Sequence, residues 1–145
     1  MCTHNKLNSI WHYSHYYGDM LFSAKRLYDN EEPYAAVMIL FNATELLLKS
    51  VRGNYSKTFS EDVETLVKQG ILTVEEQKYL NDEMGIKNIR NIMTHRNAYQ
   101  YCLESLEGKA FMFSDPETWS IIFALHFDNI VEILYNAVNK SALLE

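Results

Sequence analysis

In the second half of the chain, three residues carry groups that could cleave a phosphodiester without a metal. Arg90 is a permanent cation, Asn91 an amide beside it, and His95 an imidazole that titrates near neutrality. In RNA cleavage the attacking 2′-hydroxyl loses a proton and the leaving 5′ oxygen gains one, and an imidazole can serve either step. We therefore predict that His95 is the general base or acid, that Arg90 stabilises the phosphoryl charge, and that Asn91 positions one of them.

The charge around these residues also favours an anionic ligand. The chain has a formal net charge of −6, which argues against a protein that coats nucleic acid through a generally basic surface. The segment 84–103 nevertheless contains no acidic residue and adds Lys87 and Arg96 to the motif. We predict that Lys87 and Arg96 bind a phosphate-bearing substrate. The alternative is a basic helix face that is only solvated.

The spacing of Arg90 and His95 poses a geometric problem. Five residues on an ideal helix correspond to roughly 140° of rotation, so the two side chains would point apart. They converge only if the helix breaks between them or if a second protomer supplies the missing group. Twofold symmetry would place two such motifs side by side, while a break in the helix before His95 would bring the two groups together within one chain.

The elements that must hold these residues are helices. Apolar residues at helical spacing, two capping boxes and prolines at first helical positions predict helices at about 9–28, 33–51, 58–67, 73–97 (interrupted or bent at Gly85) and 116–138. The segment 99–113 alternates apolar residues and fits either a small hairpin or an irregular flap. We predict an all-α bundle of four to five helices forming a single domain over residues 1–145.

The motif and the second predicted helix together resemble a known superfamily. An arginine, a polar residue, three variable residues and a histidine form the signature of the HEPN superfamily (higher eukaryotes and prokaryotes nucleotide-binding), matched here by Arg90, Asn91 and His95. The segment 35–49 is similar to the second helix of that family. The resemblance implies an all-α homodimer with its motifs facing each other across the interface. It also implies a metal-independent endoribonuclease that leaves 2′,3′-cyclic phosphate and 5′-hydroxyl ends.

The resemblance extends to biological roles and partners. Many members act in toxin–antitoxin, phage-defence or CRISPR systems, so an RNA substrate and an antitoxin or nucleotidyltransferase partner are expected. In toxins paired with a nucleotidyltransferase, a modified tyrosine stands two residues after the histidine, where this chain has Asn97. Other members are non-catalytic modules that bind a nucleotide or a partner protein, and this is the second hypothesis. A third is an adaptor dimer built on the aromatic residues at 11–17.

The remaining chemistry-bearing residues have plainer interpretations. Glu45 is expected to pair with Lys49 one helical turn away, and His126 to lie in the core. His12 and His15 have metal-compatible spacing but no third ligand nearby, so neither a metal nor a cofactor is predicted.

The cysteines, the N-terminal segment and the length of the apolar runs indicate where the protein is expected to act in the cell. Cys2 and Cys102 make neither a disulfide framework nor a metal-ligand pattern, which favours free thiols. The N-terminus has no apolar stretch typical of a secretory signal, and no apolar run approaches the roughly 18 residues that a membrane span needs. A cytoplasmic protein without membrane contact is expected.

Overall fold

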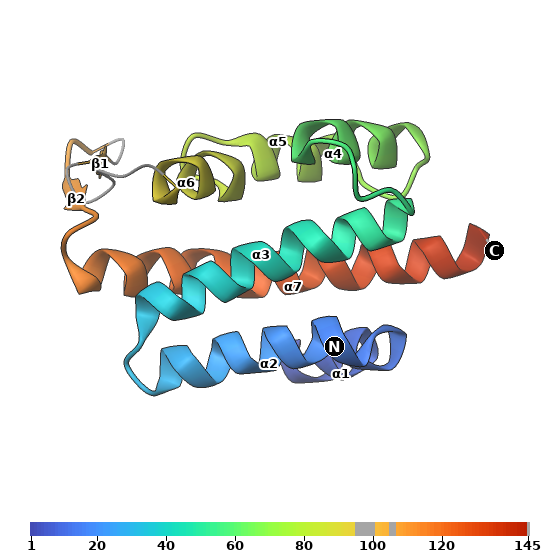
Figure 1. Cartoon of the computed structure of the whole chain (residues 1–145), viewed down its shortest axis with the longest axis horizontal. Coiled ribbons are helices and arrows are strands. Elements are labelled where there is room, and N and C mark those ends of the chain that lie inside the picture. The colour runs from blue at the N-terminus through green and yellow to red at the C-terminus, as the bar shows by residue number, and fades with distance from the viewer. Residues whose placement is uncertain (95–100, 105–106, 145) are drawn as a thin grey trace.

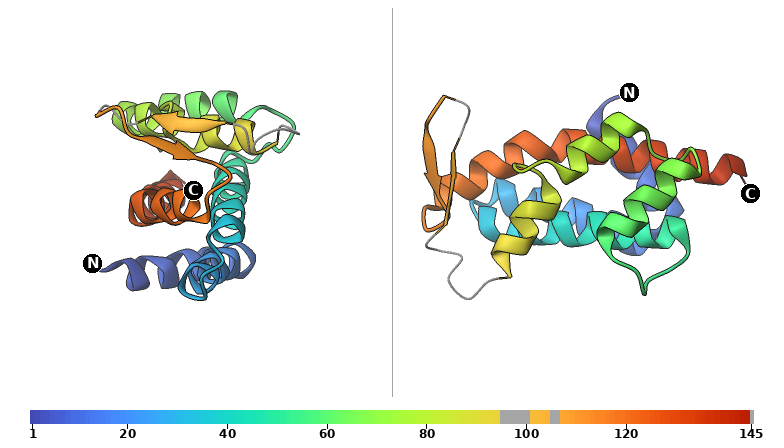
Figure 2. Two further views of the ribbon diagram at one scale, coloured as in Figure 1. Left: turned by 90° about the vertical axis from the view of Figure 1, so that its left-hand side faces the viewer. Right: turned by 90° about the horizontal axis from the view of Figure 1, so that it is seen from above.

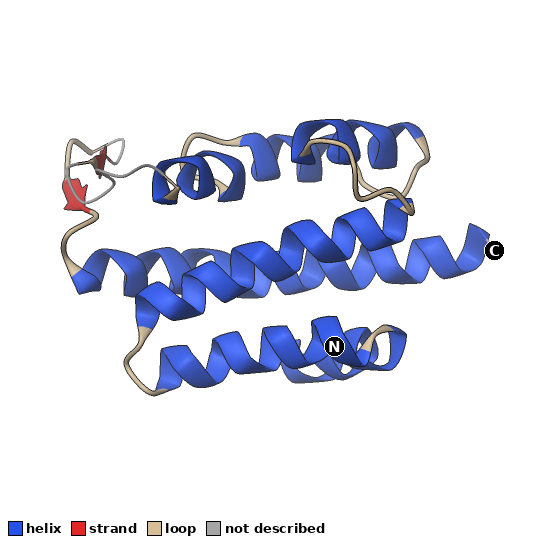
Figure 3. Ribbon diagram, viewed as in Figure 1, coloured by secondary structure: helices blue, strands red, loops and turns tan. Residues whose placement is uncertain are grey.

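The computed structural model describes residues 1–94, 101–104 and 107–144. Within these residues the chain forms seven helices and two short strands (Figures 1 and 3). The elements are α1 (Thr3–Tyr13), α2 (His15–Asp29), α3 (Pro33–Arg52), α4 (Phe59–Lys68), α5 (Val74–Asn81), α6 (Ile86–Met93), β1 (Cys102–Glu104), β2 (Ala110–Met112) and α7 (Pro116–Leu144). The predicted all-α class is confirmed in this broad sense, but the described helices outnumber the four to five expected.

The helices are arranged in three layers, with α3 and α7 in the middle (Figure 1). On one side lie α1 and α2, and on the other α4, α5 and α6, as the end-on view in Figure 2 confirms. The two middle helices therefore have neighbours on both sides, which explains why α3 is apolar around most of its circumference. The largest fully buried side chains come from all three layers: Phe41, Phe123, Ile10, Leu21, Leu40, Leu47, Leu48, Leu66, Leu80, Ile89, Ile130 and Leu134.

The predicted first helix is two helices, because the chain turns at Ser14. The backbone of Ser14 is extended (φ −149°, ψ 111°), and its hydroxyl accepts a hydrogen bond from the Tyr17 N–H at 3.3 Å, which caps α2. The two helices then touch at Gly18, where an added Cβ would lie 2.5 Å from the Cα of Trp11. The apolar periodicity continues through the turn, so it concealed this break.

The other helix ends follow local signals. Gly53 ends α3 in the left-handed conformation (φ 81°), and its N–H donates to the Lys49 carbonyl. Capping boxes at Thr58 and Thr73 begin α4 and α5 as predicted. Gly85 separates α5 from α6, which confirms the predicted interruption.

Of the two alternatives for 99–113, the structure has the hairpin. β1 and β2 pair antiparallel with Leu103 opposite Phe111, and the Phe113 N–H donates to the Tyr101 carbonyl at 3.1 Å. Cys2 and Cys102 are exposed and free, as expected.

In the described part of the chain, two helices are long and apolar enough to cross a membrane by length and composition, contrary to the expectation that no segment is. They are Pro33–Arg52 and Pro116–Leu144, and about half of each apolar stretch is buried inside the protein. Both belong to the middle layer, where a buried core helix has the same composition as a membrane span.

Candidate functional site

The first half of the predicted motif lies on α6, a helix of only two turns. Its buried face holds Ile86 and Ile89 against the rest of the protein. Lys87, Arg90 and Asn91 share another face, because residues three and four apart are neighbours on a helix. The structure therefore brings together three of the five predicted site residues.

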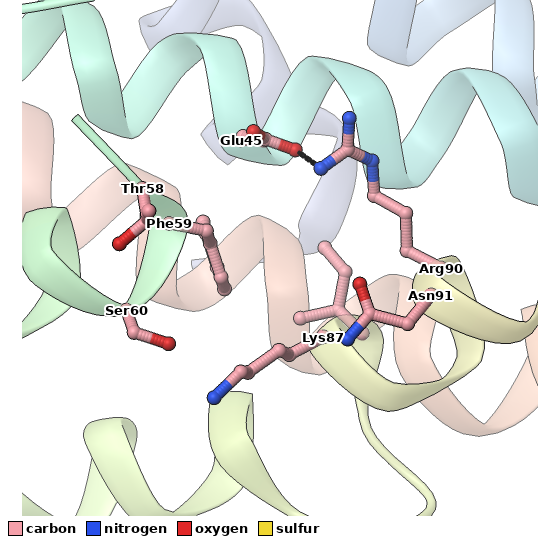
Figure 4. Close-up of a pocket in the computed structure, with 8 residues that line it drawn as sticks. Glu45, Thr58, Phe59, Ser60, Lys87, Arg90 and Asn91 are labelled. Atoms are coloured by element: carbon pink, nitrogen blue, oxygen red, sulfur yellow. Dashed lines mark ion pairs between the residues drawn. The ribbon is translucent and has the colours of Figure 1, made fainter. Parts of the chain in front are cut away.

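These three residues form one wall of a pocket of about 260 Å³ (Figure 4). The first turn of α4 faces them with Thr58, Phe59 and Ser60, and α3 contributes Glu45. Phe59 and Ile86 provide apolar surface, while the other lining residues bring two cations, one carboxylate, two hydroxyls and an amide. Typical small-ligand sites are mostly apolar, so this pocket is both more polar and slightly smaller than most of them.

The α4 side of the pocket adds positive potential. Thr58 caps α4, and its hydroxyl accepts from the Glu61 N–H at 3.2 Å. The N–H groups of Phe59 and Ser60, in the first turn, have no acceptor within the helix and carry the positive end of its dipole. They lie across from Lys87 and Arg90, in a first turn that also contains the carboxylates of Glu61 and Asp62.

Glu45 places a carboxylate beside this positive region. It forms an ion pair with the Nη1 of Arg90 (Figure 4), and its Oε1 lies 4.0 Å from the Nζ of Lys49. The expected pairing of Glu45 with Lys49 is thus confirmed. The pairing with Arg90 was not predicted, because it joins residues far apart in the sequence.

Lys49 also links this group of charges to α4, through an ion pair with Asp62. Lys49 Nζ lies 2.5 Å from Oδ2 of Asp62, and Arg52 Nη1 lies 2.7 Å from Oδ1. Asp62 has a fully buried side chain, so its two partners satisfy a carboxylate that has no access to water. This cluster attaches α4 to α3 and thereby fixes the wall of the pocket that α4 forms.

His95 and Arg96 lie outside the described residues. The approach of the His95 imidazole to the Arg90 guanidinium therefore stays a prediction. The described chain ends the helix at Thr94, whose hydroxyl donates to the Asn91 carbonyl at 2.8 Å. The next described residue is Tyr101, which leads into β1.

The pocket contains residues that the sequence did not single out as a site. Thr58 was identified only as a helix cap, and neither Phe59 nor Ser60 was assigned a role. Glu45 offered the one available signal, since it is a polar residue on a helix that is apolar on most sides. The capping box located the start of α4, but only the packing of α4 on α3 turns that start toward α6.

His126 is a buried core residue, as predicted, and its two ring nitrogens are both engaged. Nε2 lies 2.8 Å from the Met84 carbonyl and must carry the proton, so Nδ1 accepts from the Tyr79 hydroxyl at 2.5 Å. Burial lowers the pKa of His126 from its ordinary value and raises that of Tyr79. The ring thus fastens the α5–α6 connection to α7 in its neutral form.

The aromatic segment 11–17 is more exposed than a core stripe. Trp11 is half-buried, stacks on His15 with ring centroids 3.7 Å apart, and donates to Asp19 at 3.0 Å. Tyr13 and Tyr16 are exposed. Among the described residues, no group of three His, Cys, Asp or Glu side chains could hold a metal ion.

The chain matches no protein-family model, no curated protein and no solved structure.

Proposed function

We propose that this chain is a metal-independent endoribonuclease of the HEPN type that acts as a homodimer. The main support for this proposal is the position of Arg90. It lines a pocket together with Lys87 and Asn91, opposite the N-terminus of α4. Guanidinium, ammonium and helix N–H groups are all suited to a phosphate. Arg90 and Asn91 are also the first two residues of the motif that ends at His95.

In the proposed reaction the imidazole of His95 takes the proton from the ribose 2′-hydroxyl. The 2′ oxygen then forms a bond to phosphorus as the bond to the 5′ oxygen breaks, and the leaving oxygen takes a proton from water. Arg90 stabilises the phosphoryl oxygens in the transition state, while Asn91 positions the phosphate. Lys87 and Arg96 bind neighbouring phosphates. The products are a 2′,3′-cyclic phosphate and a 5′-hydroxyl.

The dimer is part of this proposal because the resemblance implies two motifs that face each other across an interface; the rotation of a continuous helix does not require it, since α6 ends at Met93, before His95. Two copies related by a twofold axis would place the Arg90 of one protomer near the His95 of its partner. A cytoplasmic toxin or phage-defence effector fits such an enzyme, and an antitoxin, such as a nucleotidyltransferase, would restrain it.

The test is cleavage of single-stranded RNA in the presence of EDTA. We expect the parent protein to cleave and His95→Ala to lose at least about 100-fold in rate, the usual contribution of a general acid or base. His12→Ala, which removes an exposed histidine of α1, is the matched control and should cleave like the parent. Equal cleavage by His95→Ala and the parent would refute the assignment.

A second candidate is a non-catalytic module that binds a nucleotide in the same pocket. The observation that favours it is the apolar surface of Phe59 and Ile86 next to the cations, since a base could pack on the former while a phosphate meets the latter. Titration calorimetry with nucleoside monophosphates distinguishes the two candidates. Nucleotide binding that Lys87→Gln weakens, without RNA cleavage by the parent, would select the binding module.

A further inference from the structure

Arg90 is held by a carboxylate that is itself held from two sides. The Glu45 side chain is only 13% exposed, whereas that of Arg90 is 39% exposed and reaches the pocket. One partner of Glu45 is Arg90 on α6, and the other is Lys49 one turn along α3. Lys49 is fixed in turn by Asp62 and by the carbonyl of Lys57. The carboxylate therefore has little freedom to follow a mobile guanidinium.

The charge balance leaves Arg90 able to attract an anion. The connected cluster contains three cations, Lys49, Arg52 and Arg90, and two carboxylates, Glu45 and Asp62. It therefore keeps a net positive charge before Lys87 is added. An arginine also has five N–H donors, and the ion pair with Glu45 engages Nη1. Among the described residues, Glu45 is the only ion-pair partner of Arg90, so the other N–H groups are left for an anion that reaches the guanidinium.

From this geometry we propose that Glu45 is a positioning residue, which holds the Arg90 guanidinium so that its remaining N–H groups meet the scissile phosphate of RNA. This inference rests on the proposed ribonuclease function. A free arginine side chain loses rotamer entropy when it is fixed in one conformation. A buried carboxylate that fixes the side chain in advance reduces that cost in the transition state.

The first arm of the test measures cleavage by the full-length protein. Glu45→Gln preserves the shape of the side chain and removes its charge, and we expect kcat to fall at least tenfold with little change in KM. The matched control is Glu64→Gln on α4, whose carboxylate is exposed and pairs with exposed Lys68. It should leave both constants unchanged.

A double-mutant cycle separates positioning from a purely structural role. If Glu45 acts through Arg90, Glu45→Gln causes no further loss of kcat in an Arg90→Gln background. A structural role would instead lower the rate equally in both backgrounds. Independent losses, parental kcat in Glu45→Gln, or faster cleavage caused by release of Arg90 would each overturn the proposal.

The second arm does not depend on activity. Phenylglyoxal modifies accessible arginines, and mass spectrometry can follow Arg90 against Arg26 as an internal reference. We expect Glu45→Gln to speed modification of Arg90 at least fivefold. If the parent does not cleave RNA but this acceleration occurs, the ribonuclease proposal fails while the holding of Arg90 by Glu45 stands. An unchanged modification rate refutes that holding. If Glu45→Gln does not fold, Glu45→Asp replaces it in both experiments. This variant keeps the negative charge on a shorter side chain, so smaller effects on kcat and on the modification rate are expected.

Discussion

Lys49 and Asp62 form a buried ion pair, with Nζ 2.5 Å from Oδ2, that joins the middle layer to the layer carrying the candidate site. The two side chains are 8% and 0% exposed, so neither charge is compensated by water. The pair fixes the position of α4, whose first turn forms one wall of the pocket. The stability of the fold and the shape of the site are therefore linked through these two residues.

Removal of the Asp62 charge should destabilise the protein strongly. Asp62→Asn leaves Lys49 and Arg52 next to a neutral amide, and loss of one partner of a buried ion pair costs roughly 3–5 kcal/mol. Urea denaturation at neutral pH measures the free energy of unfolding. Glu64→Gln, which removes an exposed charge from the same helix, should change it by less than about 0.5 kcal/mol. Similar effects for both variants would contradict the buried pair.

Gly18→Ala should destabilise the contact between α1 and α2. In an open helix this substitution would stabilise by about 1 kcal/mol, but here the new Cβ would lie 2.5 Å from the Cα of Trp11 and 2.7 Å from its Cβ. Overpacking of this kind costs roughly 1–3 kcal/mol. Trp11→Ala should not rescue the variant, because both close atoms remain. A rise in the thermal midpoint for Gly18→Ala would rule out the close approach.

His126 should make the protein less stable in mild acid. Because burial lowers the pKa of His126 below its ordinary value of 6.5, the unfolded chain takes up a proton at that position before the native protein does. The free energy of unfolding should therefore fall as the pH drops below about 6.5, by up to roughly 1.4 kcal/mol per pH unit for one proton.

The variant His126→Gln isolates this contribution. It lacks the titrating ring, so its free energy of unfolding, measured in urea between pH 5 and pH 8, should depend less on pH than that of the parent. Its stability at pH 8 is expected to be lower, since Tyr79 loses its partner at Nδ1. Parallel pH profiles for the two proteins would contradict a neutral buried His126.

Lys87 offers a test of the pocket as an RNA-binding surface. It is exposed and lines the pocket, so Lys87→Gln should weaken binding of single-stranded RNA several-fold and reduce the slope of log affinity against log salt by about one. Fluorescence anisotropy over a salt series measures both quantities. Lys78→Gln, at an exposed position of α5, is the matched control. An unchanged slope for Lys87→Gln would place the phosphates elsewhere.

Local signals predicted most helix boundaries because their physical cause is local. A threonine hydroxyl and a glutamate three residues later satisfy the first N–H groups of α4 and α5, whatever surrounds them. Gly53 likewise ends α3 through its own backbone conformation. The break at Ser14 escaped prediction, because α1 and α2 are both amphipathic and only their contact at Gly18 requires the chain to turn.

By itself, the sequence determined the helical character of the chain, the closeness of Lys87, Arg90 and Asn91 within one basic segment, and the pairing of Glu45 with Lys49. All of these depend on residues within one helical turn of each other. Only the tertiary structure decided that Glu45 meets Arg90 and that the start of α4 faces α6. Those contacts arise when separate helices pack to bury their apolar faces, and the pattern of a single helix does not specify which neighbour its polar residues will meet.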